Sequence, residues 1–133
     1  MARPSWRRRA AVAVEYAIIL PAFLMFILGL MDCGRLIWTY SMLARAVEAA
    51  SRCAAVNAAT CGTTTATQAY AVAQAWGLTT TTSMFAVTPA ASCGGVSVVG
   101  TMPFTFVIPW FYGGSPFGAA NAMTLTATAC YPT

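Results

Sequence analysis

The stretch AVAVEYAIILPAFLMFILGLM, residues 11–31, decides the fold class of this 133-residue chain. It has the length of a membrane-spanning helix and contains one ionisable side chain, that of Glu15. A secretory signal has a shorter apolar core of about 7–15 residues, followed closely by a cleavage site of small residues. Because this core is longer and no such site follows Met31, we expect a transmembrane helix that stays in the mature protein.

The charged residues indicate how this helix is oriented. Arg7, Arg8 and Arg9 directly precede the apolar stretch, and arginine is preferentially retained on the cytoplasmic side of a membrane. The sequence therefore predicts a cytoplasmic basic leader at residues 1–10 and a C-terminal part beyond the membrane. With four of the seven arginines in this leader, the net charge of +4 does not indicate a nucleic-acid partner.

The helical pattern continues past the membrane segment. Apolar residues recur at steps of three and four, the spacing of one helical face, over residues 32–58 (Leu36, Tyr40, Leu43, Val47, Ala50 and Ala54). Glu48 lies three residues after Arg45 and four before Arg52, spacings at which helical ion pairs form on a solvated face. Pro21 lacks an amide hydrogen and crowds the preceding turn, so we expect a kink there.

Residues 59–133 predict a small α+β domain. Thr65 and Gln68 have the spacing of a helix-capping box and predict the start of a short second helix. Gly77 is expected to end this helix. Its predicted apolar face consists of Ala69, Val72, Ala73 and Trp76. Alternation then predicts strands around 96–100, 104–108 and 124–131. The fold class is thus a long kinked transmembrane helix, a short second helix and an antiparallel sheet of three to four strands.

Four cysteines lie beyond the membrane, where disulfides persist. In the last predicted strand Cys130 alternates with the apolar residues, so it points away from the long helix that carries Cys53. We therefore expect the pairs Cys93–Cys130 and Cys53–Cys61, with Cys33 left unpaired. Zinc is the competing interpretation, but the chain has no histidine and no C-x-x-C spacing, so we predict no metal site.

The run MPFTFVIPWFYGGSPF, residues 102–117, is rich in aromatic residues. Its prolines limit it to an edge strand or a loop. Aromatic side chains favour interfaces, so the run is either a docking or membrane-facing surface or part of the core. The residues of the possible docking surface are Phe104, Phe106, Trp110, Phe111 and Tyr112.

The composition argues against catalysis. Beyond Arg52 the chain contains no His, Lys, Asp or Glu, so no triad or acid–base pair can be assembled there. It also lacks a phosphate-binding glycine-rich loop. We predict a protein that is not an enzyme and needs no cofactor.

The opening stretch RRRAAVAVEYAIILPAFLMFILGLMDCGRLIWTYSMLARAVEAASRCAAV resembles the TadE-like proteins, minor pilins of the tight-adherence (Flp/Tad) branch of type IV pilus systems. The resemblance is carried by the basic leader, Glu15-Tyr16, Pro21 and the Asp32-Cys33-Gly34-Arg35 step, whose Asp32 and Arg35 form a helical pair. The tail is similar to the C-terminal end of the same family, more loosely.

The resemblance implies processing by a prepilin peptidase that leaves glutamate at the fifth mature position. Counting back from Glu15 places the cut between Ala10 and Ala11, and the new α-ammonium of Ala11 can then pair with Glu15 in its own helix or in a neighbouring subunit. Such pairing across subunits, with Tyr16 and Pro21 beside it, implies a role in assembly register. The alternative is that Glu15 reaches back to the lipid headgroups.

These features together predict a minor pilin or pseudopilin that assembles an adhesive Tad pilus. Its expected location is the bacterial inner membrane, with a periplasmic C-terminal domain and a possible place in the surface pilus. Expected partners are the membrane, other pilins or pseudopilins, the prepilin peptidase and the pilus assembly platform. The alternative is a membrane-anchored scaffold protein that docks a secretion or assembly platform.

Overall fold

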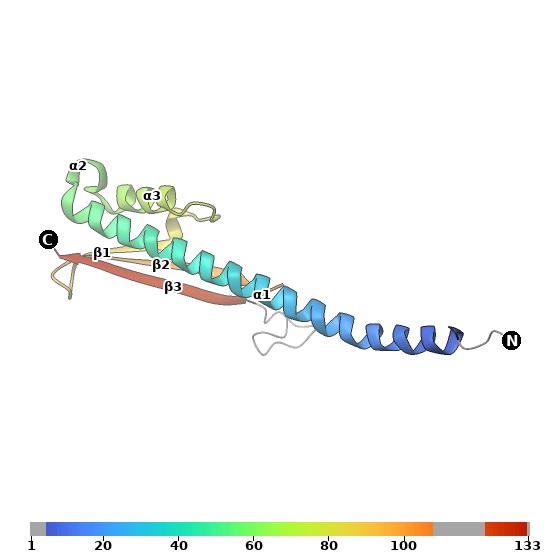
Figure 1. Cartoon of the computed structure of the whole chain (residues 1–133). Coiled ribbons are helices and arrows are strands. Elements are labelled where there is room, and N and C mark those ends of the chain that lie inside the picture. Colours follow the sequence, from blue (N-terminus) through green and yellow to red (C-terminus); the bar gives the residue numbers. More distant parts are fainter. Residues whose placement is uncertain (1–4, 108–121, 133) are drawn as a thin grey trace. The chain divides into compact units, whose positions relative to one another are not determined.

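The computed structural model of the chain describes residues 5–107 and 122–132 (Figure 1). Its contacts divide the chain into two units. The first comprises Met1–Gly34 and Phe106–Asn121, and the second comprises Arg35–Thr105 and Ala122–Thr133. The first unit contains the apolar stretch, and the second contains the sheet, so the two are described in turn.

Helix α1 (Ser5–Val56) contributes residues to both units. It begins within the basic leader, earlier than the sequence predicts, and it stays helical through Pro21. Proline removes one backbone hydrogen bond, so the helix continues there with one donor fewer. The helix includes the leader, the apolar stretch and its extension without a break, so the boundaries between these three segments stay predictions.

The second unit holds a three-stranded antiparallel sheet in the order β1-β2-β3. Its strands are β1 (Phe85–Ala91), β2 (Gly95–Thr105) and β3 (Ala122–Pro132). With α1, this sheet makes the described chain an α+β protein, which confirms the predicted fold class. Strand β3 shows the predicted alternation, because Leu125 and Ala127 are buried while the threonines between and beside them are exposed.

The core of this unit forms where α1 packs on the inner face of the sheet. The helix contributes a fully buried face of Leu43, Ala46, Val47 and Ala50. This face lies over Gly100 of β2, where a Cβ atom would come within 3.0 Å of Leu43 and 2.8 Å of Val47. The absence of a side chain at Gly100 therefore lets helix and sheet approach closely.

The buried face of α1 differs from the predicted face most clearly at Tyr40. Thr39 is buried, whereas Tyr40 is exposed, because the packed face follows residues 39, 43, 46, 47 and 50. The step from 39 to 43 is four residues, which keeps Thr39 in line with Leu43 on the same side of the helix.

Two short helices follow α1, and α3 lies beside the same stretch of α1 as the sheet does (Figure 1). Helix α2 (Ala58–Cys61) is a single turn, and the Asn57 side chain caps it by accepting a hydrogen bond from the amide of Thr60. Helix α3 (Thr64–Gln74) is capped by Thr63, whose side chain accepts a hydrogen bond from the amide of Ala66, and not by Thr65 as the sequence predicts.

The predicted apolar face of α3 is wrong. Thr67 and Ala71 are its buried residues, whereas Trp76 lies in the turn beyond the helix and is 72% exposed. The Thr67 hydroxyl donates to the carbonyls of Cys61 and Thr63, which satisfies its polar group in the core. Gly77 does adopt the expected left-handed conformation, with φ of 74°.

Candidate functional site

The N-terminal part of α1 exposes its apolar side chains along the whole stretch 11–28. The large exposed side chains include Val12, Tyr16, Ile18, Phe23 and Phe26. None of the most apolar part of this helix is buried, and its length and composition suffice to cross a membrane. An apolar surface of this kind is unfavourable in water, so the helix fits membrane anchoring.

The predicted processing and register residues all lie on this helix. Ala10, Ala11, Glu15 and Tyr16 are exposed there, and Pro21 is exposed within the same helix. Arg7, Arg8 and Arg9 are helical as well. The structure thus places these residues on one element, and their roles in cleavage and assembly stay predictions.

Asp32 is the buried carboxylate of the first unit, with 1% of its surface exposed. Its Oδ2 atom accepts a hydrogen bond of 2.9 Å from the backbone amide of Val107. A buried carboxylate is costly unless it is hydrogen-bonded, so this bond stabilises it and ties the chain at Val107 to α1. Sequence reasoning assigned Asp32 to a helical pair with Arg35 and did not anticipate the bond to Val107.

Arg35 belongs to the second unit, where its guanidinium lies 5.4 Å from the ring centre of Phe104. This is a cation–π distance. Phe104 itself is buried, with 5% exposed, so for this residue the structure supports the core alternative over a docking surface. Phe106 is half-buried, and Trp110, Phe111 and Tyr112 lie outside the described residues.

The cysteines of the second unit lie at disulfide distance in the pairs that the sequence predicts. The Cα atoms of Cys53 and Cys61 are 5.7 Å apart, and those of Cys93 and Cys130 are 6.5 Å apart. Cys33 is free and exposed. Among the described residues no group of three potential metal ligands occurs.

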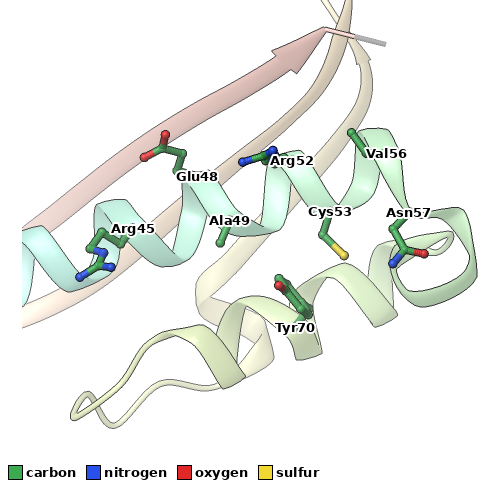
Figure 2. Close-up of a pocket in the computed structure, with 8 residues that line it drawn as sticks. All are labelled: Arg45, Glu48, Ala49, Arg52, Cys53, Val56, Asn57 and Tyr70. Carbon is green, nitrogen blue, oxygen red and sulfur yellow. The ribbon is translucent and has the colours of Figure 1, made fainter.

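A polar cleft between α1 and α3 is a feature that sequence reasoning missed (Figure 2). It has a volume of about 500 Å³ and is lined by Arg45, Glu48, Arg52 and Tyr70 together with Ala49, Cys53, Val56 and Asn57. Figure 2 shows the ring of Tyr70 directed from α3 towards α1. The spacing of the three charged residues is visible in the sequence, but the neighbouring α3 is not.

Arg45, Glu48 and Arg52 lie on the solvated face that the sequence predicts, in the part of the chain that the structure describes. The side chains of these three residues make no hydrogen bond or ion pair with other described residues. Exposed charges gain little free energy from pairing because water solvates them, which accounts for the absence of the ion pairs. These three charges are therefore available to an external group.

The described structure is that of an α+β protein whose long helix fits membrane anchoring. In comparison with known families, the family model of the TadE-like proteins matches residues 10–52. The match confirms the resemblance of the opening stretch and suggests an association with Tad pili. It falls within α1 and does not extend to α2, α3 or the sheet. No curated protein and no solved structure matches the chain.

Proposed function

We propose that this protein is a minor pilin or pseudopilin that acts in the assembly of a Tad-type adhesive pilus, with no enzymatic activity of its own. One observation supports the proposal above all others. The TadE-like match, residues 10–52, lies within α1, and in the stretch 11–28 of this helix the exposed apolar side chains surround a single acid, Glu15. A helix of this kind suits both insertion into a membrane and packing against other helices.

In this proposal the basic leader stays in the cytoplasm and the second unit faces the periplasm. The three arginines at 7–9 support this orientation because positive charge is retained on the cytoplasmic side. The partners are other pilins or pseudopilins, the prepilin peptidase that cuts between Ala10 and Ala11, and the assembly platform in the inner membrane.

Glu15 is the residue we propose to set the register of assembly. An isolated carboxylate in the apolar core of a membrane costs on the order of 2.5–3.5 kcal/mol or more, so it requires a partner. Cleavage before Ala11 supplies one, because the new α-ammonium lies four residues away on the helix. Pairing with the ammonium of a neighbouring subunit would fix the axial position of one helix against the next.

The first test is the mature N-terminus. We expect mass spectrometry of the protein purified from membranes of peptidase-positive cells to find Ala11 as the first residue, and Met1 or Ala2 when the peptidase is absent. An uncut protein in peptidase-positive cells would contradict the processing and the ammonium partner that depends on it.

The second test separates register from mere insertion. We expect Glu15→Gln to insert normally but to lose pilus assembly, since the amide cannot pair with an ammonium, and Glu15→Asp to retain part of it. Ile18→Ala, at an exposed position one turn along, is the matched control and should assemble normally. If Glu15→Gln assembled as well as the wild type, Glu15 would serve only to reach the headgroups.

The alternative function is a scaffold that remains in the inner membrane and docks the assembly platform. Fractionation distinguishes the two, because a minor pilin enters sheared surface filaments and a scaffold stays in the inner-membrane fraction. We expect the processed protein in both fractions, and its complete absence from filaments would favour a pseudopilin or scaffold.

A further inference from the structure

Two adjoining hollows lie along α1 and α3. The first is the polar cleft of Figure 2, and the second, of about 490 Å³, is lined by Trp38, Met42, Arg45, Ala49, Gln74 and Trp76. The hollows share the lining residues Arg45 and Ala49, so they adjoin each other along α1. We call this surface the α1/α3 groove.

Two tryptophans border one end of the α1/α3 groove. Trp38 comes from α1 and is 61% exposed, and Trp76 comes from the turn after α3 and is 72% exposed. Single exposed apolar side chains are common on protein surfaces, whereas here two tryptophans and Met42 line the same hollow. Tryptophan, tyrosine, methionine and arginine are the residue types enriched in protein interfaces, and the groove contains all four.

The charges of the groove are unbalanced. Arg45 and Arg52 provide two cations against the one anion of Glu48, and none of the three makes an ion pair in the described chain. The 81 residues that follow Arg52 carry no Asp, Glu, Lys or Arg, so neither α3 nor the sheet can neutralise them. A carboxylate that pairs with Arg45 or Arg52, other than that of Glu48, would therefore belong to another molecule.

We propose that the α1/α3 groove docks an acidic segment of a different protein. An aromatic or aliphatic side chain of the segment sits between Trp38 and Trp76, and its carboxylates pair with Arg45 and Arg52. A second copy of this chain is a poor occupant because its three acids are Glu15 in the apolar stretch, the buried Asp32 and Glu48 of the groove itself. This docking does not depend on the proposed pilus function.

The test places a photo-crosslinking amino acid, p-benzoylphenylalanine, at Gln74 of the full-length protein in its native cells. Gln74 lines the groove and leaves its tryptophans and arginines in place. We expect the crosslinked peptide, mapped by mass spectrometry, to be an acidic segment of another protein. The same probe at Thr126, on the exposed face of β3, is the control and should not give this crosslink.

Charge variants decide whether the groove recognises carboxylates. We expect Arg45→Glu with Arg52→Glu to reduce the crosslink about tenfold, and Arg45→Lys with Arg52→Lys to retain most of it. A synthetic peptide of the mapped segment should bind the detergent-solubilised protein and lose affinity when its acids become amides. Retained disulfides and unchanged near-ultraviolet circular dichroism would establish that the variants are folded.

Several outcomes would overturn the proposal. One is a crosslink from Gln74 to a second copy of the chain, to lipid, or to a neutral or basic segment of another protein. Another is a crosslink yield at Gln74 no higher than that at Thr126. A third is a crosslink yield that does not change when Arg45 and Arg52 are replaced by glutamate. None of them bears on cleavage before Ala11 or on the role of Glu15, so the docking proposal and the pilus proposal can fail separately.

Discussion

The two disulfides of the second unit should contribute unequally to stability. Cross-linking stabilises a fold mainly by restricting the unfolded chain, and the effect grows with the length of the closed loop. For the sequence separation of 8 between Cys53 and Cys61 the loop-entropy relation gives about 2.5 kcal/mol, and for the separation of 37 between Cys93 and Cys130 it gives about 4 kcal/mol. Removing the second pair should therefore destabilise the unit more.

The assay is urea unfolding of the full-length protein in detergent micelles, followed by near-ultraviolet circular dichroism. We compare the wild type with the double variants Cys53→Ala/Cys61→Ala and Cys93→Ala/Cys130→Ala. Cys61 is buried, so its truncation also removes packing. Measuring all three proteins under reducing conditions isolates that packing loss, because no disulfide then remains.

The pairing itself is checked by non-reducing peptide mapping. Trypsin alone cannot resolve it, because no arginine or lysine follows Arg52 and all four cysteines stay in one fragment. Trypsin with chymotrypsin should give peptide 53–70 with an internal bridge, and peptides 86–104 and 126–133 joined to each other. A peptide that links Cys53 to Cys130, or a larger loss of stability from the Cys53/Cys61 variant after the packing correction, would refute the reasoning.

Two further substitutions test the packing of α1. Gly100→Ala should lower the free energy of unfolding by about 1–2 kcal/mol in the same urea assay. The added methyl group overpacks against Leu43 and Val47, and this cost outweighs the stabilisation from restricting the unfolded chain at a former glycine. A stabilised variant would show that helix and sheet are not in close contact. Asp32→Ala should lower the free energy of unfolding by about 1–3 kcal/mol because it leaves the Val107 amide without its acceptor, and Asp32→Asn should lower it less. The direct readout is faster hydrogen exchange of the Val107 amide in Asp32→Ala. Unchanged exchange would contradict the hydrogen bond.

The elements with a strong period were predictable from the sequence. Helix α1 follows from a long apolar stretch and a continuing helical spacing, and β3 follows from the alternation of threonine with apolar residues. Both patterns reflect the side on which an element is buried, so they can be recognised in the sequence without knowing which elements pack against that side.

The elements with weak or local signals were not predictable. Strand β1 shows a short alternation of Phe85 and Val87 that Pro89 interrupts, and α2 is a single turn in a polar segment. The face of α3 was misjudged because its alanines fit several orientations. The buried side is fixed by contacts such as the hydrogen bond from the Gln68 amide to the carbonyl of Phe85, 17 residues away.

Some parts of the candidate sites could likewise be predicted from the sequence, and others could not. The apolar stretch, Glu15 and the arginines are local features, and the sequence shows them directly. The α1/α3 groove depends on α3 folding back beside α1, and the bond between Asp32 and Val107 joins residues that are 75 positions apart. Such juxtapositions arise from the tertiary fold and leave no periodic trace in a single sequence.

The sheet carries no charged side chain, and this affects the solution conditions in which the second unit stays folded. The unit contains one acidic side chain, Glu48, whose carboxylate makes no ion pair with other described residues, so added salt has little attraction between charges to screen. Its cohesion comes from apolar contact, backbone bonding and the two covalent crosslinks. A fold built in this way should keep its shape across wide changes in salt concentration.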